Sequence, residues 1–330
     1  MPKRNLLIHD DLMAIAQSYR PSRILLSAIE LGIFETVRSE NLTAKKVATR
    51  IGANSRATEI ILDALTGLGL LEKNGNEYSN VPLIMDMLCG FSSDALISYF
   101  RHQSNSWQNW SALTEVVKAG FPAKRQWDNH GSIDLAGAMR YGSKEVAERL
   151  DLMVDFSDIR NICDLGCGPG AVCMELLQKH PHLSAVLIDY DEEALNIAGR
   201  EAQSRNFQDR VRLMQKDILD ANVEENFDMV IMSLVLCLFN RKDAIRLLEK
   251  AKMLLRPGGV LILGEVLLDG SRKTPASATL FAVHLLVTGA MGGLFSLDDI
   301  RKMLIDCGIR YQRNFPTNLY HIIVGKNEIG

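Results

Sequence analysis

Residues 161–170 read NICDLGCGPG, a short apolar run that leads into an Asp and then into three glycines within five residues. The apolar run predicts a buried strand. The glycines predict a turn whose backbone can approach a bound molecule without a Cβ in the way. Such turns bind phosphates, dinucleotides and other ligands alike. The neighbouring segments therefore have to identify the ligand.

From Ile159 onward, short apolar runs alternate with segments of helical spacing. This alternation predicts strand–helix–strand units, and hence a parallel sheet covered by helices on both faces. The last two runs adjoin each other and predict an antiparallel hairpin at the end of the sheet. The expected strands cover 161–166, 183–190, 210–217, 227–234, 259–268, 309–315 and 319–326.

The N-terminal part has the pattern of a winged helix. Helical spacing covers 6–20 and 24–37, Thr43 and Ser55 are candidate caps of two further helices, and a hairpin is expected to turn at Asn74-Gly75. Residues 1–90 hold ten Lys/Arg and ten Asp/Glu, whereas a module that reads DNA concentrates basic residues. A dimerisation role is therefore favoured over DNA reading.

Length and composition set the remaining limits. A chain of 330 residues predicts two domains, and we place the divisions at 1–90, a helical linker at 91–150 that contributes to the acceptor pocket, and 151–330. The net charge of −3 gives no reason to expect nucleic acid or an anionic membrane as a partner. The uncharged run Ala276–Leu297 fits a buried helix plus loop better than a membrane span. Six cysteines without a CxxC pair favour reduced thiols, no metal site and a cytoplasmic location.

The segment 91–150 carries three tryptophans within 21 residues: Trp107, Trp110 and Trp127. Core packing is expected for two of them. The indole of the third can form one wall of an aromatic pocket.

The glycine turn narrows the choice of ligand. A Walker loop is excluded, because Ala171 and Val172 follow Gly170 where Lys and Ser or Thr are needed. The tight spacing of Gly166 and Gly168, with Asp164 on the strand, departs from the dinucleotide pattern GxGxxG. It is instead typical of S-adenosyl-L-methionine sites.

The ends of the next two strands agree with this assignment. Asp189, followed by Tyr190, ends the second strand, and its carboxylate can accept both ribose hydroxyls. Asp217 ends the third strand, where it can take the adenine amino group while Ile218 packs on the ring. Three acids in order on consecutive strands indicate S-adenosyl-L-methionine rather than NAD.

These motifs identify a family resemblance over nearly the whole length. The matching pieces are SRILLSAIELGIFETV, WSALTEVVKAG, DLGCGPG, VLIDYD, QKDIL and LLRPGGVLILGEVLL. The chain resembles the caffeate-type O-methyltransferases of plants and bacteria. The resemblance implies a winged-helix dimerisation domain, a homodimer formed through the N-terminal helices, and a Rossmann-like class I methyltransferase domain. It also places Ser233 in the cofactor site and Met139 near the sulfonium.

The chain departs from the family at the catalytic base. The family shows Leu-His-Asp-Trp after the fourth strand, and the His position holds Cys237 here. The Glu that helps to orient that His aligns with Phe295, whereas the second supporting carboxylate matches Glu265. The apolar neighbours of Cys237 favour a small core residue. His284 is then the remaining acid/base candidate, with a satisfied core histidine as the alternative.

The leading interpretation is a methyltransferase acting on a small aromatic or conjugated molecule, with oxygen as the expected target. Cys237 and Phe295 motivate an alternative, a family member that methylates carbon or nitrogen or does not methylate at all. A third hypothesis is a winged-helix regulator that responds to S-adenosylmethionine. The neutral charge of residues 1–90 disfavours this regulator.

Overall fold

The computed structural model describes residues 9–90, 93–122, 131–220, 223–318 and 320–328. The chain packs as two compact units, residues 1–104 and 105–330. The first unit is mainly helical, and the second contains the large sheet. The divisions expected from the sequence, near residues 90 and 150, remain predictions.

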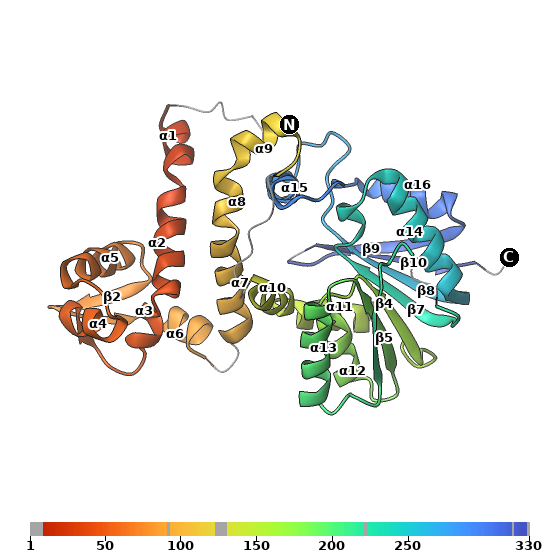
Figure 1. Ribbon diagram of the computed structural model, residues 1–330, viewed down its shortest axis with the longest axis horizontal. Coiled ribbons are helices and arrows are strands. Elements are labelled where there is room, and N and C mark those ends of the chain that lie inside the picture. The colour runs from red at the N-terminus through yellow and green to blue at the C-terminus, as the bar shows by residue number, and fades with distance from the viewer. Residues whose placement is uncertain (1–8, 91–92, 123–130, 221–222, 319, 329–330) are drawn as a thin grey trace. The chain divides into compact units, whose positions relative to one another are not determined.

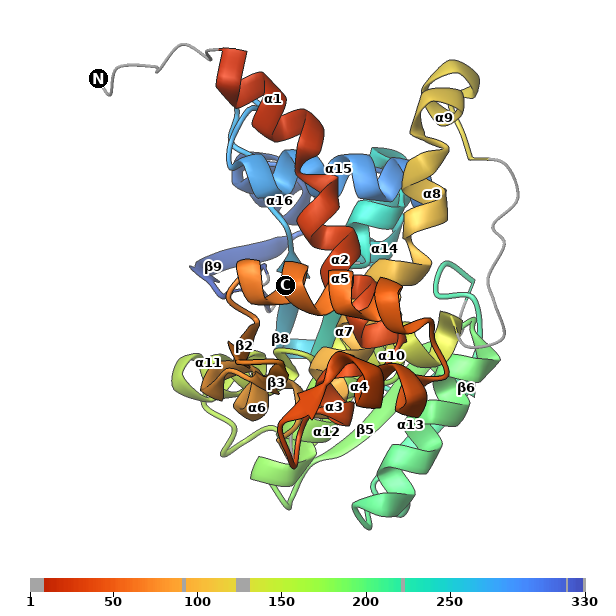
Figure 2. The ribbon, with the colours of Figure 1, turned by 90° about the vertical axis from the view of Figure 1, so that its left-hand side faces the viewer.

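The first unit opens with α1 (His9–Gln17) and α2 (Tyr19–Glu30), which follow each other as one nearly continuous rod (Figures 1 and 2). Helix α1 has no buried residue, although Leu12 and Ile15 are apolar and exposed. The single helix expected over 24–37 is wrong. Gly32 adopts a left-handed φ of 67° and separates α2 from α3 (Ile33–Thr36).

Two capped helices and a small sheet complete this part. Thr43 caps α4 (Ala44–Ile51), as predicted, because its side chain accepts the N–H of Lys46. Helix α5 (Ser55–Gly67) is capped by Asn54 rather than by Ser55. The predicted hairpin is confirmed with its turn one residue later, at Gly75-Asn76, where Gly75 has a φ of 61°. Its strands pair with a third in a sheet of order β1-β3-β2, formed by β1 (Leu42–Thr43), β2 (Leu71–Asn74) and β3 (Glu77–Asn80).

Helices lead from this part to the large sheet. In chain order they are α6 (Pro82–Leu88), α7 (Ser93–Asn105), α8 (Trp107–Ser111), α9 (Leu113–Ala119), α10 (Gly131–Arg140) and α11 (Ser143–Met153). Trp107 and Trp110 are half-buried on α8 rather than in the core. Trp127 lies outside the described residues.

The second unit is built on a seven-stranded sheet of order β6-β5-β4-β7-β8-β10-β9, which confirms the predicted fold class. The first five strands in this order are parallel, and β10 runs antiparallel between β8 and β9. The predicted antiparallel hairpin of β9 and β10 is therefore present. Its second strand, β10, lies between β8 and β9, so β9 is the edge strand. The strands are β4 (Asn161–Leu165), β5 (Ser184–Asp189), β6 (Val211–Gln215), β7 (Phe227–Ser233), β8 (Leu255–Glu265), β9 (Ile309–Pro316) and β10 (His321–Asn327).

Helices cover both faces of this sheet (Figure 1). On one face, α11, α12 (Ala171–Lys179) and α13 (Glu192–Ser204) pack around Ile162 and Leu187. On the other, α14 (Arg241–Leu254) and α16 (Leu297–Asp306) pack around Val230 and Leu263. Strands buried on both faces explain why their sequences are almost continuously apolar.

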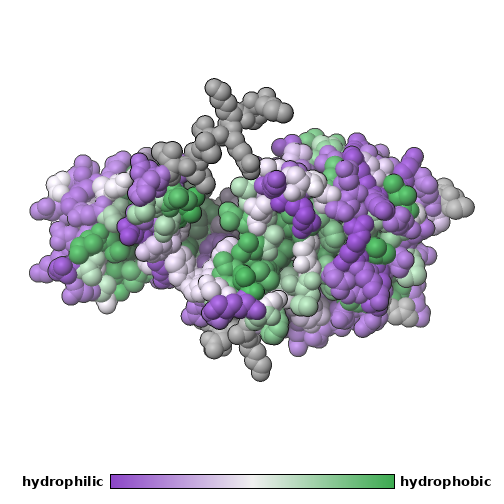
Figure 3. All heavy atoms as spheres, turned by 90° about the horizontal axis from the view of Figure 1, so that it is seen from above, coloured by the Kyte–Doolittle hydropathy of each residue, from purple (hydrophilic) through white to green (hydrophobic). Residues whose placement is uncertain are grey.

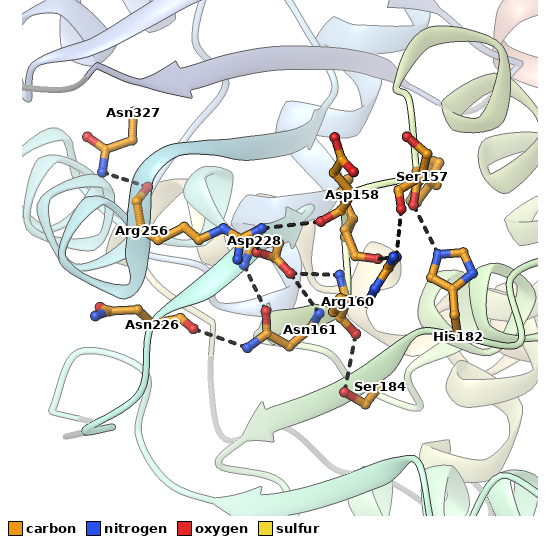
Figure 4. A network of polar contacts seen from close by, with 12 residues as sticks. Ser157, Asp158, Arg160, Asn161, His182, Ser184, Asn226, Asp228, Arg256 and Asn327 are labelled. Atoms are coloured by element: carbon orange, nitrogen blue, oxygen red, sulfur yellow. Dashed lines mark hydrogen bonds and ion pairs between the residues drawn. The ribbon is translucent and has the colours of Figure 1, made fainter.

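A polar network around Asp228 links the strands at the end of the sheet where the parallel strands begin, here called the amino edge (Figure 4). The opposite end, where these strands finish, is the carboxyl edge. The buried carboxylate of Asp228, at the start of β7, accepts the N–H of Arg160 at 2.7 Å and of Asn161 at 3.1 Å. It also forms an ion pair with Arg256 of β8. The contacts join β4, β7 and β8 at the end of the sheet opposite to the glycine turn.

The run 276–297 forms helix α15 (Ala276–Thr288), which ends at the left-handed Gly289, and then a loop. Among the described residues, no helix has both the length and the apolar character needed to cross a membrane. Within those ranges, no group of His, Cys, Asp and Glu side chains is arranged to hold a metal ion. All six cysteines are free and buried.

Candidate functional site

The glycine turn leaves β4 at the carboxyl edge of the sheet. Gly166, Gly168 and Gly170 all have positive φ, at 72°, 52° and 68°. The N–H groups of Gly166 and Cys167 donate to the carbonyl of Ile188 on β5, at 2.8 and 3.1 Å. The turn is therefore fixed to the neighbouring strand, in a backbone conformation that side chains with a Cβ rarely adopt.

Side chains from three other segments lie directly on this turn. A Cβ on Gly166 would come within 2.8 Å of Val235 Cγ2 and 3.6 Å of Ile218 Cδ1. A Cβ on Gly168 would lie 3.0 Å from the sulfur of Met139, which α10 carries. The structure thus brings together Gly166, Gly168 and Ile218, which the sequence made candidates, Met139, which the family resemblance suggested, and Val235.

Asp189 sits at the end of β5, and its carboxylate faces the turn. One oxygen accepts the N–H of Gly168 at 2.7 Å, and the other accepts the N–H of Asp191 at 3.0 Å. The side chain is buried, so these two bonds fix its orientation. Each carboxylate oxygen has a further lone pair with which it can accept a ligand hydroxyl. The next residue, Tyr190, is 74% exposed.

Asp164, which the sequence also makes a candidate for the cofactor site, is only 4% exposed. It is buried on β4, where the thiol of Cys173 is its hydrogen-bond partner. Burial raises the pKa of Asp164 to about 7. Asp164 therefore supports the turn from within the domain.

Asp217 and Ile218 lie just beyond the end of β6, whereas Asp189 is the last residue of the neighbouring strand β5. Asp217 is exposed, and its carboxylate accepts the N–H of Leu219 at 2.9 Å. Ile218 is buried against the core that surrounds the turn. The pair therefore offers one exposed acceptor and one apolar surface at this edge.

Ser233 ends β7 and shares a hydrogen bond with the hydroxyl of Tyr320, whose pKa burial raises to about 12. The next residue, Leu234, has a φ of 56°, which is rare for a residue with a branched side chain. Its N–H donates to the carbonyl of Gly264 on β8 at 2.7 Å. Strained backbone of this kind persists only where the surroundings enforce it.

Cys237 lies in the short 3₁₀ turn Leu236–Leu238 that follows. It is buried in a small apolar cluster with Leu268, Ala278, Leu285 and Leu294. Burial, together with the nearby carboxylate of Glu265, raises the pKa of the Cys237 thiol well above its usual value. A thiol in this state is a poor proton acceptor at neutral pH.

His284 lies on α15, next to Leu285. Because Leu285 belongs to the same apolar cluster as Cys237, α15 packs on the turn that contains Cys237. The imidazole stacks on Trp110 at 6.4 Å and on Phe281 at 5.9 Å between ring centroids, with interplanar angles of 26° and 22°. Helices α8 and α15 pack against each other within the second unit. Trp110 is therefore the tryptophan that contacts His284, and the aromatic wall expected from the sequence stays a prediction.

Phe295 lies partly buried against the core of the sheet, and its carbonyl accepts the N–H of Leu268. No carboxylate stands at its position. Sequence reasoning missed Val235 and Tyr320. Val235 has a weak signal, since it follows Ser233 closely, but Tyr320 comes from a distant segment whose pairing only the folded sheet reveals.

Comparisons with known proteins cover both parts of the chain. The model of the O-methyltransferase dimerisation domain matches residues 13–84, and a methyltransferase-domain model matches residues 157–305. The chain is 27% identical to the 3-hydroxy-5-methyl-1-naphthoate 3-O-methyltransferase of Streptomyces sahachiroi over 307 residues, which cover 90% of this chain and 88% of that one. It is 25% identical to the N,N-dimethyltransferase OxyT of Streptomyces rimosus over 316 residues, covering 92% and 91%.

Among solved structures, an O-methyltransferase family protein from Burkholderia thailandensis superposes with a TM-score of 0.89 at 26% identity, covering 98% of this chain and 99% of that one. Both domains, their order and the sheet topology are thus accounted for together. The chain belongs to the S-adenosylmethionine-dependent O-methyltransferases that carry an N-terminal dimerisation domain.

Proposed function

We propose that this methyltransferase methylates a hydroxyl group of a small aromatic or conjugated acceptor. The observation that carries the proposal is the cradle at the carboxyl edge of the sheet, where Met139, Ile218 and Asp189 surround a turn of left-handed glycines. The similarity to a naphthoate O-methyltransferase supports the choice of acceptor class and of oxygen.

The residues of the cradle fit S-adenosylmethionine. Asp189 would accept the ribose hydroxyls through the lone pairs that its backbone partners leave available. Asp217 would accept the adenine amino group, with Ile218 against the ring. Gly166 and Gly168 would let backbone approach the methionyl chain and ribose. Asp164 would support the turn from below, while Tyr190, Ser233 and Met139 would complete the walls.

When bound, S-adenosylmethionine supplies an electrophilic methyl group and leaves as a neutral thioether. Positioning of the acceptor oxygen is then the main requirement on the protein. The acceptor also loses a proton, and His284 is the group we propose to receive it. Its ring plane is set by Trp110 and Phe281, which also offer an aromatic surface. A positioned acid/base group contributes about 10²–10⁴-fold.

Methylation of nitrogen is the second candidate. The observation that favours it is Cys237, buried and held with a raised pKa where the family carries a histidine. A neutral amine or ring nitrogen attacks through its own lone pair, so it does not have to be deprotonated first as a phenol does. The similarity to an N,N-dimethyltransferase is consistent with this alternative.

For the assembly we propose a homodimer formed through α1 and α2, on a domain of winged-helix type. Helix α1 buries no residue although it carries Leu12 and Ile15. Figure 3 shows hydrophobic side chains gathered in patches on the N-terminal unit, at the left of the view. Light scattering should give about twice the chain mass of 36.8 kDa. We further propose a cytoplasmic enzyme of secondary metabolism.

Incubation with methyl-labelled S-adenosylmethionine and matched sets of phenols, anilines and azaheterocycles tests the function. We expect label on phenolic oxygen, and label on nitrogen alone would favour the second candidate. His284→Ala should lower kcat at least tenfold, because a positioned base is lost. Phe281→Leu is the matched control, since it thins the stack and keeps the imidazole. A His284→Ala variant with unchanged kcat would remove His284 from proton transfer.

A further inference from the structure

Glu265 is a buried carboxyl group at the end of β8 that serves a single turn of the chain. Its Oε1 accepts the N–H of Leu236 at 2.8 Å. The backbone of Val235 and of Cys237 and the Cys237 thiol are further hydrogen-bond partners. Three consecutive residues of one turn therefore converge on one carboxyl group. In the described chain, no ion pair joins it.

On the side of the glycine turn, the segment that Glu265 holds is closely packed. Val235 Cγ2 lies 2.8 Å from where a Cβ on Gly166 would stand, so Val235 rests on the start of the glycine turn. Leu234, just before it, is held at a φ of 56°. A shift of this segment would be transmitted directly to Gly166.

The other side of the turn is equally close to a second backbone. A Cβ on Gly292 would come within 2.4 Å of the carbonyl oxygens of Cys237 and of Phe239. Gly292 belongs to the loop after α15, the helix that carries His284. Residues 234–239 therefore lie between the glycine turn at 166–170 and the loop that follows α15, the helix that carries His284.

We propose that Glu265 is a positioning residue whose carboxylate holds the 234–239 turn between methyl donor and acceptor by accepting its backbone N–H groups. It does so in place of orienting a histidine, which this chain lacks at position 237. The inference rests on the proposed function for the identity of the two ligands. It rests on the geometry alone for the coupling of Glu265 to the turn.

Protonation of Glu265 should loosen the turn, because a carboxylic acid accepts fewer N–H groups than a carboxylate. Burial raises the pKa of Glu265 from its usual 4.5 to about 7, against the lowering effect of its hydrogen bonds. The titratable groups beside it are Cys237 on the turn, Tyr320, and His321. His321 lies opposite Glu265 in the backbone register of β10 and β8. Activity should therefore fall on the acid side of about pH 7.

The free energy of unfolding should respond to protonation of Glu265 in the direction opposite to that of activity. A carboxyl group whose folded-state pKa is raised contributes stability below its unfolded pKa and loses it as pH rises through the folded pKa. Glu265 thus favours folding in acid, over the window from 4.5 to about 7, while the proposal predicts lower activity there. A purely structural role would not separate these two trends.

The test compares Glu265→Gln with Glu249→Gln, an exposed carboxyl on α14 that serves as the matched control. Glu265→Gln should lower kcat about ten- to a hundredfold and remove the acid limb from the pH profile of kcat. Cys237→Ala keeps the carboxylate and deletes one donor, so it should move that limb to higher pH. A Glu265→Gln enzyme with the wild-type kcat and acid limb would overturn the proposal.

A readout without turnover separates this inference from the proposed function. Amide hydrogen exchange at 235–237 should speed up relative to the rest of the sheet in the wild-type protein below about pH 7, and at every pH in Glu265→Gln. Protection unchanged by both pH and substitution would overturn the proposal even if the acceptor is still unidentified. Should Glu265→Gln not fold, the Cys237→Ala shift in exchange and in the acid limb provides the same decision.

Discussion

The two edges of the large sheet each bury a carboxyl group on backbone N–H groups, but in different ways. At the amino edge, Asp228 is 2% exposed, accepts two N–H groups and forms an ion pair with Arg256 (Figure 4). At the carboxyl edge, Glu265 is also 2% exposed, yet it serves a strained turn and has a pKa raised to about 7. The carboxylate with a cationic partner joins three strands of the sheet. A carboxyl group without one can titrate near neutral pH.

Backbone geometry follows the same division. The carboxyl edge holds Leu234 at positive φ, next to Gly166 and Gly168. These conformations cost free energy, and they persist because packing around the site enforces them. The amino edge stabilises the domain, whereas the carboxyl edge gives up some stability for a defined shape.

The largest expected effect on stability is at the amino edge. Asp228→Ala leaves two buried N–H groups unsatisfied and removes the partner of Arg256. We expect a loss of about 2–4 kcal/mol in the free energy of unfolding, measured with denaturant. The kcat of the molecules that remain folded should not change. Asp209→Ala, at an exposed turn, is the control. If Asp228→Ala changes the free energy of unfolding as little as the control does, Asp228 does not hold β4, β7 and β8 together.

At the carboxyl edge, Gly166→Ala should act chiefly on the cofactor. A Cβ there meets Val235 at 2.8 Å, and the φ of 72° is strained for alanine. We expect the Kd of S-adenosylmethionine, from calorimetry, to rise about a hundredfold, equivalent to about 2.7 kcal/mol. Gly69→Ala has the same φ of 72° with nothing within 4 Å and lies outside the proposed cofactor site, so it measures how much folding stability the strain alone costs. A loss of stability no larger for Gly166→Ala than for Gly69→Ala, together with an unchanged Kd, would show that the contact with Val235 is unimportant.

Asp189→Ala should weaken the cofactor less. It removes the proposed acceptor of the ribose hydroxyls and frees the N–H groups of Gly168 and Asp191. Unpaired polar groups cost about 1–3 kcal/mol, so the Kd of S-adenosylmethionine should rise at least about tenfold. Asp189→Asn keeps one acceptor oxygen and should lose less. Unchanged binding by Asp189→Ala would exclude this side chain from the site.

These differences also show what a sequence can reveal. The alternation of apolar runs and helical segments predicted the sheet and its closing hairpin, because burial on both faces imposes that pattern. Gly166, Gly168 and Asp189 were predictable because their chemistry is local to strand ends. Resemblance to a family supplied Met139 and Glu265 as candidates.

Contacts that depend on tertiary register were out of reach. Nothing near Glu265 in the chain indicates that its partners are the N–H groups of 235–237, which the pairing of β7 with β8 brings close. The hydrogen bond between Ser233 and Tyr320 has the same origin. Local errors arose where two neighbours compete for one role, as Asn54 and Ser55 do for the cap of α5.

The smallest expected effect is at Cys237, although the family places its base there. A serine hydroxyl is close to the thiol in size and can donate to Glu265, so Cys237→Ser should keep most of the activity and the acid limb of the pH profile. Cys237→His should not raise kcat, for two reasons. The carboxyl of Glu265 is already engaged by the backbone of the turn, and Phe295 offers no carboxylate to fix the imidazole tautomer. Profiles of kcat against pH for the two variants, with cofactor affinity measured in parallel, check both expectations. If Cys237→Ser abolishes turnover while fold and cofactor affinity persist, the thiol takes part in the reaction. The carboxyl edge would then hold a catalytic pair of Cys237 and Glu265 rather than a positioning one.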